Sequence, residues 1–422
     1  MTATQLSVAF FLQMAIILAV CRGVGRLARC IGQPQVVGEM IAGVLLGPSL
    51  LGIVLPHWQQ ALFPAESLKT LYIGAQLGVG LYMFLVGVEF RTDLFRARVK
   101  SAAAVSLAGI VVPFALAAVL AGCLLKIPGL FSDHAIWFQA FLFLGAAIAI
   151  TAFPMLARII YERGLTGTSL AALALSSGAI NDAAAWCVLA VVLASFGGGA
   201  TIVVKAIGGG IAYALVVLLI GRPLLQKLGA IVERDGKMTN TVLGFVLMLL
   251  MLGAWAMDAI GIHAVFGGFL LGAAMPRGLF ARELQQKLEP FAVVFLLPMF
   301  FTFSGLNTRL GMVSTGSLML VAAVIFLAST LGKGVACWAA ARLNGENNRT
   351  ALAVGTLMNA RGLMELIIVN IGLQRGVIQP ALFSMLVLMA IITTLMASPV
   401  FEWVYGRRAR ELGELGAAPL RA

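Results

Sequence analysis

Long apolar runs separated by short polar stretches cover almost the whole chain. Thirteen such segments lie at residues 6–28, 34–54, 68–90, 101–125, 135–160, 168–196, 200–220, 239–258, 261–275, 291–305, 313–341, 350–373 and 380–404. A helix needs about 20 apolar residues to cross the hydrocarbon core of a bilayer. The pattern therefore predicts an all-α integral membrane protein with about thirteen transmembrane helices, and it leaves little chain for a soluble domain.

Composition supports the same class. Hydrophobic residues make up 61% of the 422 positions and charged residues 11%, against about 45–50% and about 25% in soluble domains. These values exclude a soluble globular protein, a disordered chain, a collagen and a small disulfide scaffold. The five cysteines are scattered without paired spacing, which favours packing roles over disulfides or metal sites.

The basic residues indicate how the chain is oriented. The formal net charge is +12, and of the 29 Lys and Arg residues, 22 fall in one alternate set of gaps, four in the other and three inside apolar segments. Cytoplasmic loops carry the excess of Lys and Arg in membrane proteins. The split predicts the N-terminus outside and the C-terminus in the cytoplasm. Because the charges sit in short loops, we expect no nucleic-acid partner.

The two halves of the chain repeat each other. Ala42–Gly47 in the second segment is similar to Gly267–Gly272 in the ninth, and five of fourteen residues of Leu81–Leu94 are identical in Leu297–Leu310. The matched segments are seven apart, an odd number, so the halves are expected to have opposite orientations in the membrane. Inverted repeats of this kind are typical of secondary transporters.

Two segments, also seven apart, are interrupted by helix-breaking residues. The fifth contains Thr151–Pro154, and the twelfth contains Asn359–Gly362. Proline lacks a backbone N–H and disfavours helix at the residue before it. Helices broken at matched positions of two halves indicate an ion site near the middle of the membrane.

Asp182 is the strongest candidate for that site. It lies about 14 residues, or about 20 Å of helix, from either end of the sixth segment, where burying a charge is costly. Asn181 offers an amide oxygen, Ser177 lies about one turn earlier, and Thr151 lies at the break in the fifth segment. Oxygen ligands suit a hard cation, and burial raises a carboxyl pKa towards neutrality. A group that holds either a monovalent cation or a proton is sufficient for exchange.

Five further residues are expected to compensate charge or support the broken helices: Lys333, Arg361, Glu365, Asn359 and Pro154. Lys333, inside the eleventh segment, is expected to neutralise helix-dipole ends or pair with a carboxylate, or else to extend to the inner surface. Arg361 and Glu365 are four residues apart and are expected to pair and hold the break in shape.

Nothing in the sequence indicates an enzyme. The three histidines have no metal-ligand spacing, and the chain carries no nucleophile elbow, zinc-binding helix or phosphate-binding loop. We expect no cofactor and no catalytic residue. Besides an antiporter, the residues leave open a potassium efflux channel gated by a ligand or partner and a sodium-coupled symporter of organic solutes.

The stretches that carry chemistry also resemble a known family. Residues 38–48, 84–89, 149–158, 181–186, 262–267 and 358–366 together are similar to the monovalent cation:proton antiporter-2 family, and particularly to its plant-type cation/proton exchangers. The resemblance spans nearly all of residues 6–404. It implies the sodium/proton antiporter fold, with two inverted repeats and two broken helices that cross, and exchange of K⁺ or Na⁺ for H⁺.

The resemblance also implies a domain organisation and an assembly. Residues 1–100 and 239–310 would form a dimer panel, 101–196 and 311–404 a core that moves, 197–238 a link and 405–422 a cytoplasmic tail. The family implies a homodimer in the bacterial inner membrane. Since the chain ends about twenty residues after its last apolar segment, we expect no nucleotide-binding domain in it.

The family assigns roles to particular residues. It implies that Asp182 carries the cation or proton with Asn181 as its partner, and that Lys333 is the lysine of the core. Electrogenic relatives have a second aspartate where this chain has Asn181, which favours electroneutral, one-for-one exchange. The choice between K⁺ and Na⁺ stays open.

Overall fold

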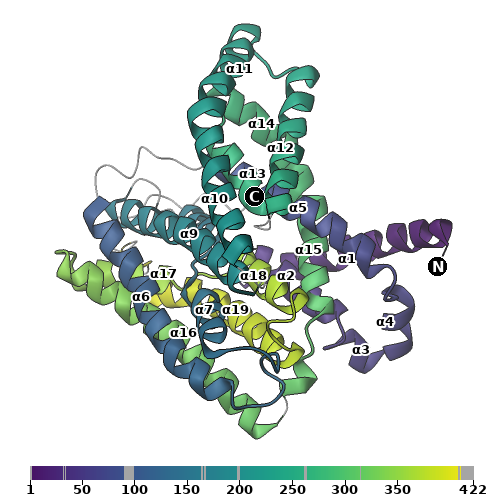
Figure 1. Cartoon of the computed structure of the whole chain (residues 1–422), viewed down its shortest axis with the longest axis vertical. Helices are drawn as coiled ribbons and strands as arrows, with labels where there is room; N and C mark the ends of the chain where they lie inside the picture. Colours follow the sequence, from purple (N-terminus) through teal and green to yellow (C-terminus); the bar gives the residue numbers. More distant parts are fainter. Residues whose placement is uncertain are drawn as a thin grey trace. The chain divides into compact units, whose positions relative to one another are not determined.

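The computed structural model is helical throughout the residues it describes, which are 2–31, 33, 35–89, 99–162, 165, 168–196, 200–260, 264–313, 315–406 and 409 (Figure 1). Its α-helices are α1 (Ala3–Cys30), α2 (Gln35–Leu46), α3 (Leu51–Val54), α4 (Pro56–Leu62), α5 (Leu68–Glu89), α6 (Val99–Leu124), α7 (Trp137–Ala149), α8 (Phe153–Glu162), α9 (Ser169–Phe196), α10 (Ala200–Leu215), α11 (Arg222–Asp235), α12 (Asn240–Ile260), α13 (Ala264–Ala274), α14 (Leu279–Phe291), α15 (Leu297–Leu306), α16 (Gly316–Leu343), α17 (Asn348–Leu357), α18 (Leu363–Gln374) and α19 (Pro380–Phe401). Within this described part, the only β-type pairing is one isolated antiparallel bridge between Phe131 and Ile378.

The number of apolar helices agrees with the sequence pattern. In the described ranges, nine helices are long and apolar enough to cross a membrane, and four shorter apolar helices accompany them at Trp137–Ala149, Ser169–Gly178, Ala264–Ala274 and Glu365–Gln374. Each of the thirteen predicted segments overlaps one of these helices. The protein is therefore an all-α, multi-pass membrane protein, as predicted.

Two predicted segments are longer than expected because charged helices continue them. A π-helical turn at Val216–Gly221 joins α10 to α11, and another at Ala292–Leu296 joins α14 to α15. The charged helices α11 and α14 thus continue the apolar helices of the seventh and tenth segments. A π-turn adds one residue to a turn without ending the helix, and nothing in the apolar pattern marks it.

The chain divides into two compact units. The first contains Met1–Gly23, Ala42–Phe90 and Leu193–Leu306, and the second contains Val24–Ile41, Arg91–Val192 and Asn307–Ala422. The helices α3–α5 and α10–α15 belong to the first unit, and α6–α8 and α16–α19 to the second, together with α9 as far as Val192. The expected roles of panel, link and moving core stay predictions.

In the first unit, glycines let helix backbones approach each other closely. Cβ atoms at Gly43 of α2 and at Gly47, the residue after α2, would collide with the backbone of α15, and Cβ atoms at Gly268 and Gly272 of α13 would collide with the backbone of α5. These are equivalent positions of the two aligned hexapeptides. Small residues at helix crossings are the usual means of close packing in membranes. The inverted repeat thus makes the same kind of crossing twice.

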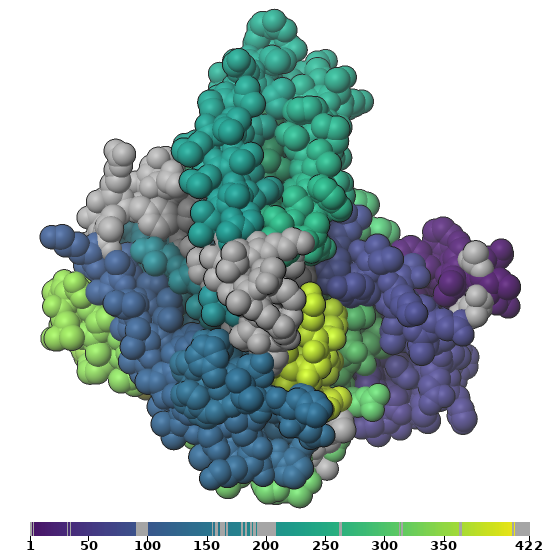
Figure 2. Space-filling view, in the orientation of Figure 1, coloured from purple at the N-terminus to yellow at the C-terminus, as the bar shows by residue number. Residues whose placement is uncertain are grey.

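The second unit surrounds the two broken helices. The helix α6 packs against α7 and α16, while α16 packs against α17 and α18 against α19 (Figure 1). The blue atoms of α6 and α7 are prominent on the visible face of this unit in the space-filling view, beside yellow and light-green atoms of its C-terminal helices (Figure 2). Most side chains of α19 are buried, as expected for a helix that is apolar on all sides. Polar groups inside this unit must therefore find partners within the protein.

Candidate ion-binding site at two broken helices

The fifth apolar segment is broken where the sequence predicted. The helix α7 ends at Ala149 and α8 begins at Phe153, so Ile150–Ala152 is not helical. Pro154 is the second residue of α8, and proline is favoured in the first turn of a helix, where its missing N–H has no partner to lose. The side chain of Pro154 lies outside the described residues.

The twelfth segment is broken as well, and the two breaks contact each other. The helix α17 ends at Leu357 and α18 begins at Leu363. The backbone N–H of Ala152 donates to the carbonyl of Ala360 at 2.9 Å. The hydroxyl of Thr151 donates to the carbonyl of Met358 at 2.7 Å. The broken segments therefore cross at the point where each has left the helical conformation.

Two positively charged side chains cap the C-terminal end of α7. Arg361 donates from Nη1 to the carbonyl of Ala147 at 2.9 Å and from Nη2 to that of Ile148 at 2.5 Å. Lys333 donates from Nζ to the carbonyl of Ala149. The last carbonyls of a helix lack partners within it and carry the negative end of the helix dipole. Both side chains are fully buried, so the ammonium of Lys333 does not reach the surface.

Arg361 also pairs with Glu365. Its Nη1 lies 3.3 Å from Oε2 of Glu365, and both side chains are almost completely buried. Glu365 lies in the first turn of α18, where a negative charge is favourable. On the other side, the hydroxyl of Thr394 in α19 donates to the carbonyl of Arg361 at 2.9 Å. Together with the bonds of Arg361 to α7, these contacts fix the twelfth-segment break to α7, α18 and α19.

Asn181 links α9 to the break in the fifth segment. Its Oδ1 accepts from the N–H of Thr151 at 2.9 Å and from Nζ of Lys333 at 3.5 Å. Because both partners are donors, they determine which amide atom is the oxygen. In this structure the Asn181 oxygen is thus engaged by an N–H and an ammonium. The Nδ2 atom has no hydrogen-bond partner among the described residues.

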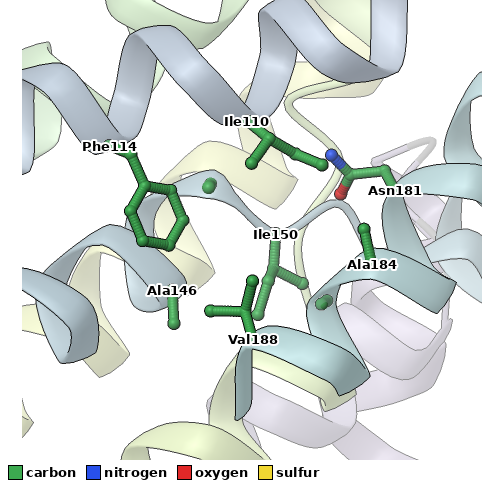
Figure 3. A pocket seen from close by; sticks show the side chains of 9 residues that line it. Ile110, Phe114, Ala146, Ile150, Asn181, Ala184 and Val188 are labelled. Carbon is green, nitrogen blue, oxygen red and sulfur yellow. The ribbon is translucent and has the colours of Figure 1, made fainter. Parts of the chain in front are cut away.

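A small cavity lies beside the Asn181 amide, between α6, α7 and α9 (Figure 3). Its lining is apolar apart from that amide: Ile110, Phe114, Ala146, Ala149, Ile150, Ala184, Ala185 and Val188. It has room for about one water molecule. A cavity of this size lined by carbon atoms cannot replace the hydration shell of an ion. The cavity is therefore not the ion site, and its apolar lining lies next to that site.

Of the remaining predicted residues, Ser177 and Asp182 lie on α9 and Asn359 lies just after α17. Ser177 is buried on α9, and its hydroxyl donates to the carbonyl of Leu173 in the same helix at 2.8 Å. Asn359 donates from Nδ2 to the carbonyls of Thr330, at 3.1 Å, and Gly355, at 3.3 Å. Asp182 follows Asn181 in α9, and its side chain lies outside the described residues.

The structure adds partners that the sequence did not indicate. The carbonyls that Arg361 and Lys333 cap are backbone groups, which no side-chain pattern marks. Thr394 and Thr330 did carry a signal, since each is a hydroxyl within a long apolar segment, and Thr330 lies three residues before Lys333 on α16. Residues at that spacing share a helix face.

These features define a class of protein. An all-helical, multi-pass membrane protein with inverted repeats and two crossing broken helices that hold buried charges has the architecture of a secondary transporter. The sequence profile described as "Sodium/hydrogen exchanger, transmembrane" matches residues 15–405. The chain belongs to this sodium/hydrogen exchanger family.

Several named antiporters are similar to nearly the whole chain. The Na⁺/H⁺ antiporter NhaS4 of Synechocystis is 39% identical over 92% of this chain and 95% of its own length. Cation/H⁺ antiporter 18 of Arabidopsis thaliana is 36% identical over 96% of this chain and 50% of its own. The K⁺/H⁺ antiporter 1 of Saccharomyces cerevisiae is 31% identical over 94% and 46%. The chain thus spans about half the length of the plant and yeast relatives.

A solved structure shares the fold. The sodium proton antiporter MjNhaP1 of Methanocaldococcus jannaschii matches with a TM-score of 0.65 and 17% identity, over 97% of this chain and 98% of its own. The fold expected from the resemblance is therefore confirmed.

Proposed function

We propose that the protein is a secondary antiporter that exchanges a monovalent cation, K⁺ or Na⁺, for H⁺ by alternating access. The observation that carries the proposal is the crossing of two broken helices, where Arg361 and Glu365 are buried as a pair and the buried Lys333 contacts Asn181, the neighbour of Asp182 in α9. The names of the relatives support it, since they describe Na⁺/H⁺, K⁺/H⁺ and cation/H⁺ antiporters.

Asp182 is the exchanging group in this scheme. When it is ionised it binds the cation with neighbouring oxygens, and when it is protonated it has no charge left to hold the cation. The ionised form of Asp182 therefore carries the cation, and the protonated form carries H⁺, through the same conformational change. The hydrogen bond from the Thr151 N–H to Asn181 Oδ1 holds the break between α7 and α8 against α9. This contact keeps the geometry around Asp182 fixed while the bound ion changes from the cation to H⁺.

The charge arrangement supports electroneutral exchange. Arg361 and Lys333 are held by the carbonyls at the end of α7, and in this scheme both keep their charge throughout the cycle. Asp182 with a bound monovalent cation has the same net charge as protonated Asp182. Moving either form across the membrane transfers the same charge in opposite directions, so one cycle moves no net charge.

Assembly and location complete the proposal. The protein is a homodimer in the bacterial inner membrane, with its N-terminus outside and its C-terminus in the cytoplasm. The distribution of Lys and Arg supports this orientation.

The main test uses proteoliposomes with an imposed pH gradient. Adding Li⁺, Na⁺, K⁺ or Rb⁺ should dissipate the gradient for the cations that are transported, and the ranking gives the selectivity. Asp182→Asn should abolish the effect because a neutral amide exchanges no proton. The matched control is Asp133→Asn, which changes an exposed carboxylate before α7 and should leave exchange intact. Gradient collapse that survives Asp182→Asn would defeat the assignment.

The second test measures voltage dependence. With the membrane potential clamped by K⁺ and valinomycin, the rate of Na⁺/H⁺ exchange should stay nearly constant between 0 and about 100 mV, since one elementary charge moved per cycle would be worth about 2.3 kcal/mol at that potential. A steep dependence would argue against electroneutral exchange. Conductance without proton coupling would instead indicate a channel, and Na⁺-driven uptake of an organic solute a symporter.

A further inference from the structure

Three arginines lie on one side of α1, near its C-terminal end. Arg22, Arg26 and Arg29 are four and three residues apart, a spacing that places side chains on the same face of a helix. All three residues are exposed. The sequence of α1 contains no aspartate or glutamate, so no carboxylate of this helix balances the three positive charges.

The end of α1 that carries Arg26 and Arg29 belongs to the second unit and is held there by α2. Gly25 and Ala28 of this end are buried. A Cβ atom at Gly38 of α2 would lie 2.6 Å from the Cα atom of Gly25, so the two helix backbones approach each other closely at this point. Because the buried face of α1 is fixed against α2, the two arginines are kept on its exposed side.

These two side chains lack an anionic partner in the protein. Within the described part of the chain, neither Arg26 nor Arg29 makes a hydrogen bond or an ion pair. The exposed Arg234 of α11, in contrast, pairs with Asp235 at 3.0 Å. Neighbouring guanidinium groups on one helix face repel each other, and an anion that bonds to both would remove the repulsion. The geometry therefore favours a negatively charged ligand at the end of α1.

The length of α1 and its apolar residues indicate what kind of anion is nearby. The helix has 28 residues, which is about 42 Å, whereas the hydrocarbon core of a bilayer is about 30 Å thick. Residues 8–20 are apolar apart from Gln13, so the excess length at the arginine end lies at the level of the lipid head groups. Leu27 and Ile31, beside the arginines, are 66% and 74% exposed. Exposed apolar and cationic side chains together suit a lipid that has both acyl chains and a negative charge.

We propose that Arg26 and Arg29 bind the phosphate of an acidic phospholipid, whose acyl chains lie against Leu27 and Ile31. Guanidinium groups bond phosphate oxygens in pairs, and Arg22, one turn earlier, adds positive charge. An acidic lipid is preferred because a zwitterionic head group already contains its own cation. The bound lipid holds the end of α1 in place against α2. This binding site is independent of the proposed antiport function.

The test titrates the purified protein, in a neutral detergent, with the short-chain acidic lipid dioctanoyl phosphatidylglycerol. A fluorophore on the exposed Cys30 reports binding, and Cys123→Ser removes the exposed cysteine of α6. The double variant Arg26→Gln/Arg29→Gln should bind this lipid about twentyfold to thirtyfold more weakly, as expected for losing two basic residues close to an anionic lipid. Dioctanoyl phosphatidylcholine should bind the unaltered protein more weakly than the acidic lipid does.

The matched control is Lys227→Gln/Arg234→Gln, which removes the same charge from exposed positions of α11. It should leave the affinity for phosphatidylglycerol unchanged, whereas an equal loss in both double variants would indicate attraction to the overall charge and overturn the site. Unchanged affinity in Arg26→Gln/Arg29→Gln would overturn it as well.

Two further measurements complete the test. Glycerol phosphate has the charged group without acyl chains and should not compete with the lipid; competition at equal concentration would replace the lipid site with a site for free phosphate. Thermal unfolding without lipid verifies that each variant is folded. With phosphatidylglycerol added, the unfolding temperature should rise for the unaltered protein and the α11 control but not for Arg26→Gln/Arg29→Gln, because a ligand stabilises only the folded state that binds it.

Discussion

Arg361 illustrates how a single side chain connects distant parts of the fold. Its guanidinium bonds two carbonyls of α7 and one carboxylate oxygen of α18, and a planar fork with five donors is suited to several acceptors at once. A lysine at position 361 would have a single ammonium group and could not make most of these contacts at once. The residue thus joins the two broken helices through bonds that span more than two hundred positions of sequence.

Removing either partner of the Arg361–Glu365 pair should have unequal effects. Arg361→Met leaves a buried carboxylate without its cation and frees carbonyls of α7, so we expect a loss of about 3–5 kcal/mol in unfolding free energy. Glu365→Gln leaves a neutral side chain, while Arg361 keeps its carbonyl partners, so the expected loss is about 1–3 kcal/mol. Equilibrium unfolding in detergent compares them. Equal losses would show that the carbonyl contacts contribute little.

At this scale the sequence predicted candidate residues better than it predicted contacts. Asn181, Lys333, Arg361, Glu365, Asn359 and Thr151 were all marked as candidates, because ionisable or amide groups inside apolar segments are expensive to bury without a purpose. Their partners were mostly backbone carbonyls of other segments. Every residue has such a carbonyl, so sequence alone cannot show which of them a side chain will reach.

At the scale of elements, the breaks were predictable and the crossings were not. Pro154 places the end of one half-helix within a few residues, because the chemistry of proline is local. The hydrogen bonds from Thr151 to Met358 and from Ala152 to Ala360 depend on two segments meeting. Nor does the apolar pattern show that α10 continues into α11, since a π-turn changes the spacing by one residue only.

The repeated glycine crossings provide a prediction about elements. Gly47→Ala and Gly272→Ala should each lower stability by about 1–3 kcal/mol, because the added methyl group would collide with the backbone of α15 or α5. Gly244→Ala in α12 meets no atom within 4 Å and should instead raise stability by about 0.5–1 kcal/mol, as alanine does in helices. Thermal unfolding of the purified variants measures all three. A stabilising effect of Gly272→Ala would contradict the close crossing.

At the scale of the whole molecule, the alternation of basic residues gives a testable topology. Cys30 is the last residue of α1 and Cys123 lies in the last turn of α6, and both are exposed. With the N-terminus outside, Cys30 faces the cytoplasm and Cys123 the exterior. In single-cysteine variants, a membrane-impermeant maleimide applied to intact cells should label Cys123 and not Cys30. Permeabilised cells should show labelling of both, and the reverse pattern in intact cells would overturn the orientation.

The inverted repeat relates the two halves of the whole molecule. Weak similarity between two pairs of apolar segments predicted it, and the glycine crossings of α2 and α13 and the two breaks show its structural counterpart. The halves have nevertheless diverged in charge. Two buried cations cap the end of α7, while the carbonyls of Gly355 and Met358 at the end of α17 accept from neutral donors.

The sequence by itself determined the number of apolar helices, the repeat, the breaks and the set of candidate polar residues. It could do so because the bilayer imposes one local rule on every segment, that apolar side chains face lipid and backbone groups bond within the helix. Only the tertiary structure decided that Arg361 and Lys333 cap α7, that Asn181 turns its oxygen to Thr151, and that Asn359 keeps a buried oxygen without a described partner. Those choices depend on which segments meet, and hydrogen bonds between groups far apart in sequence leave no pattern along the chain.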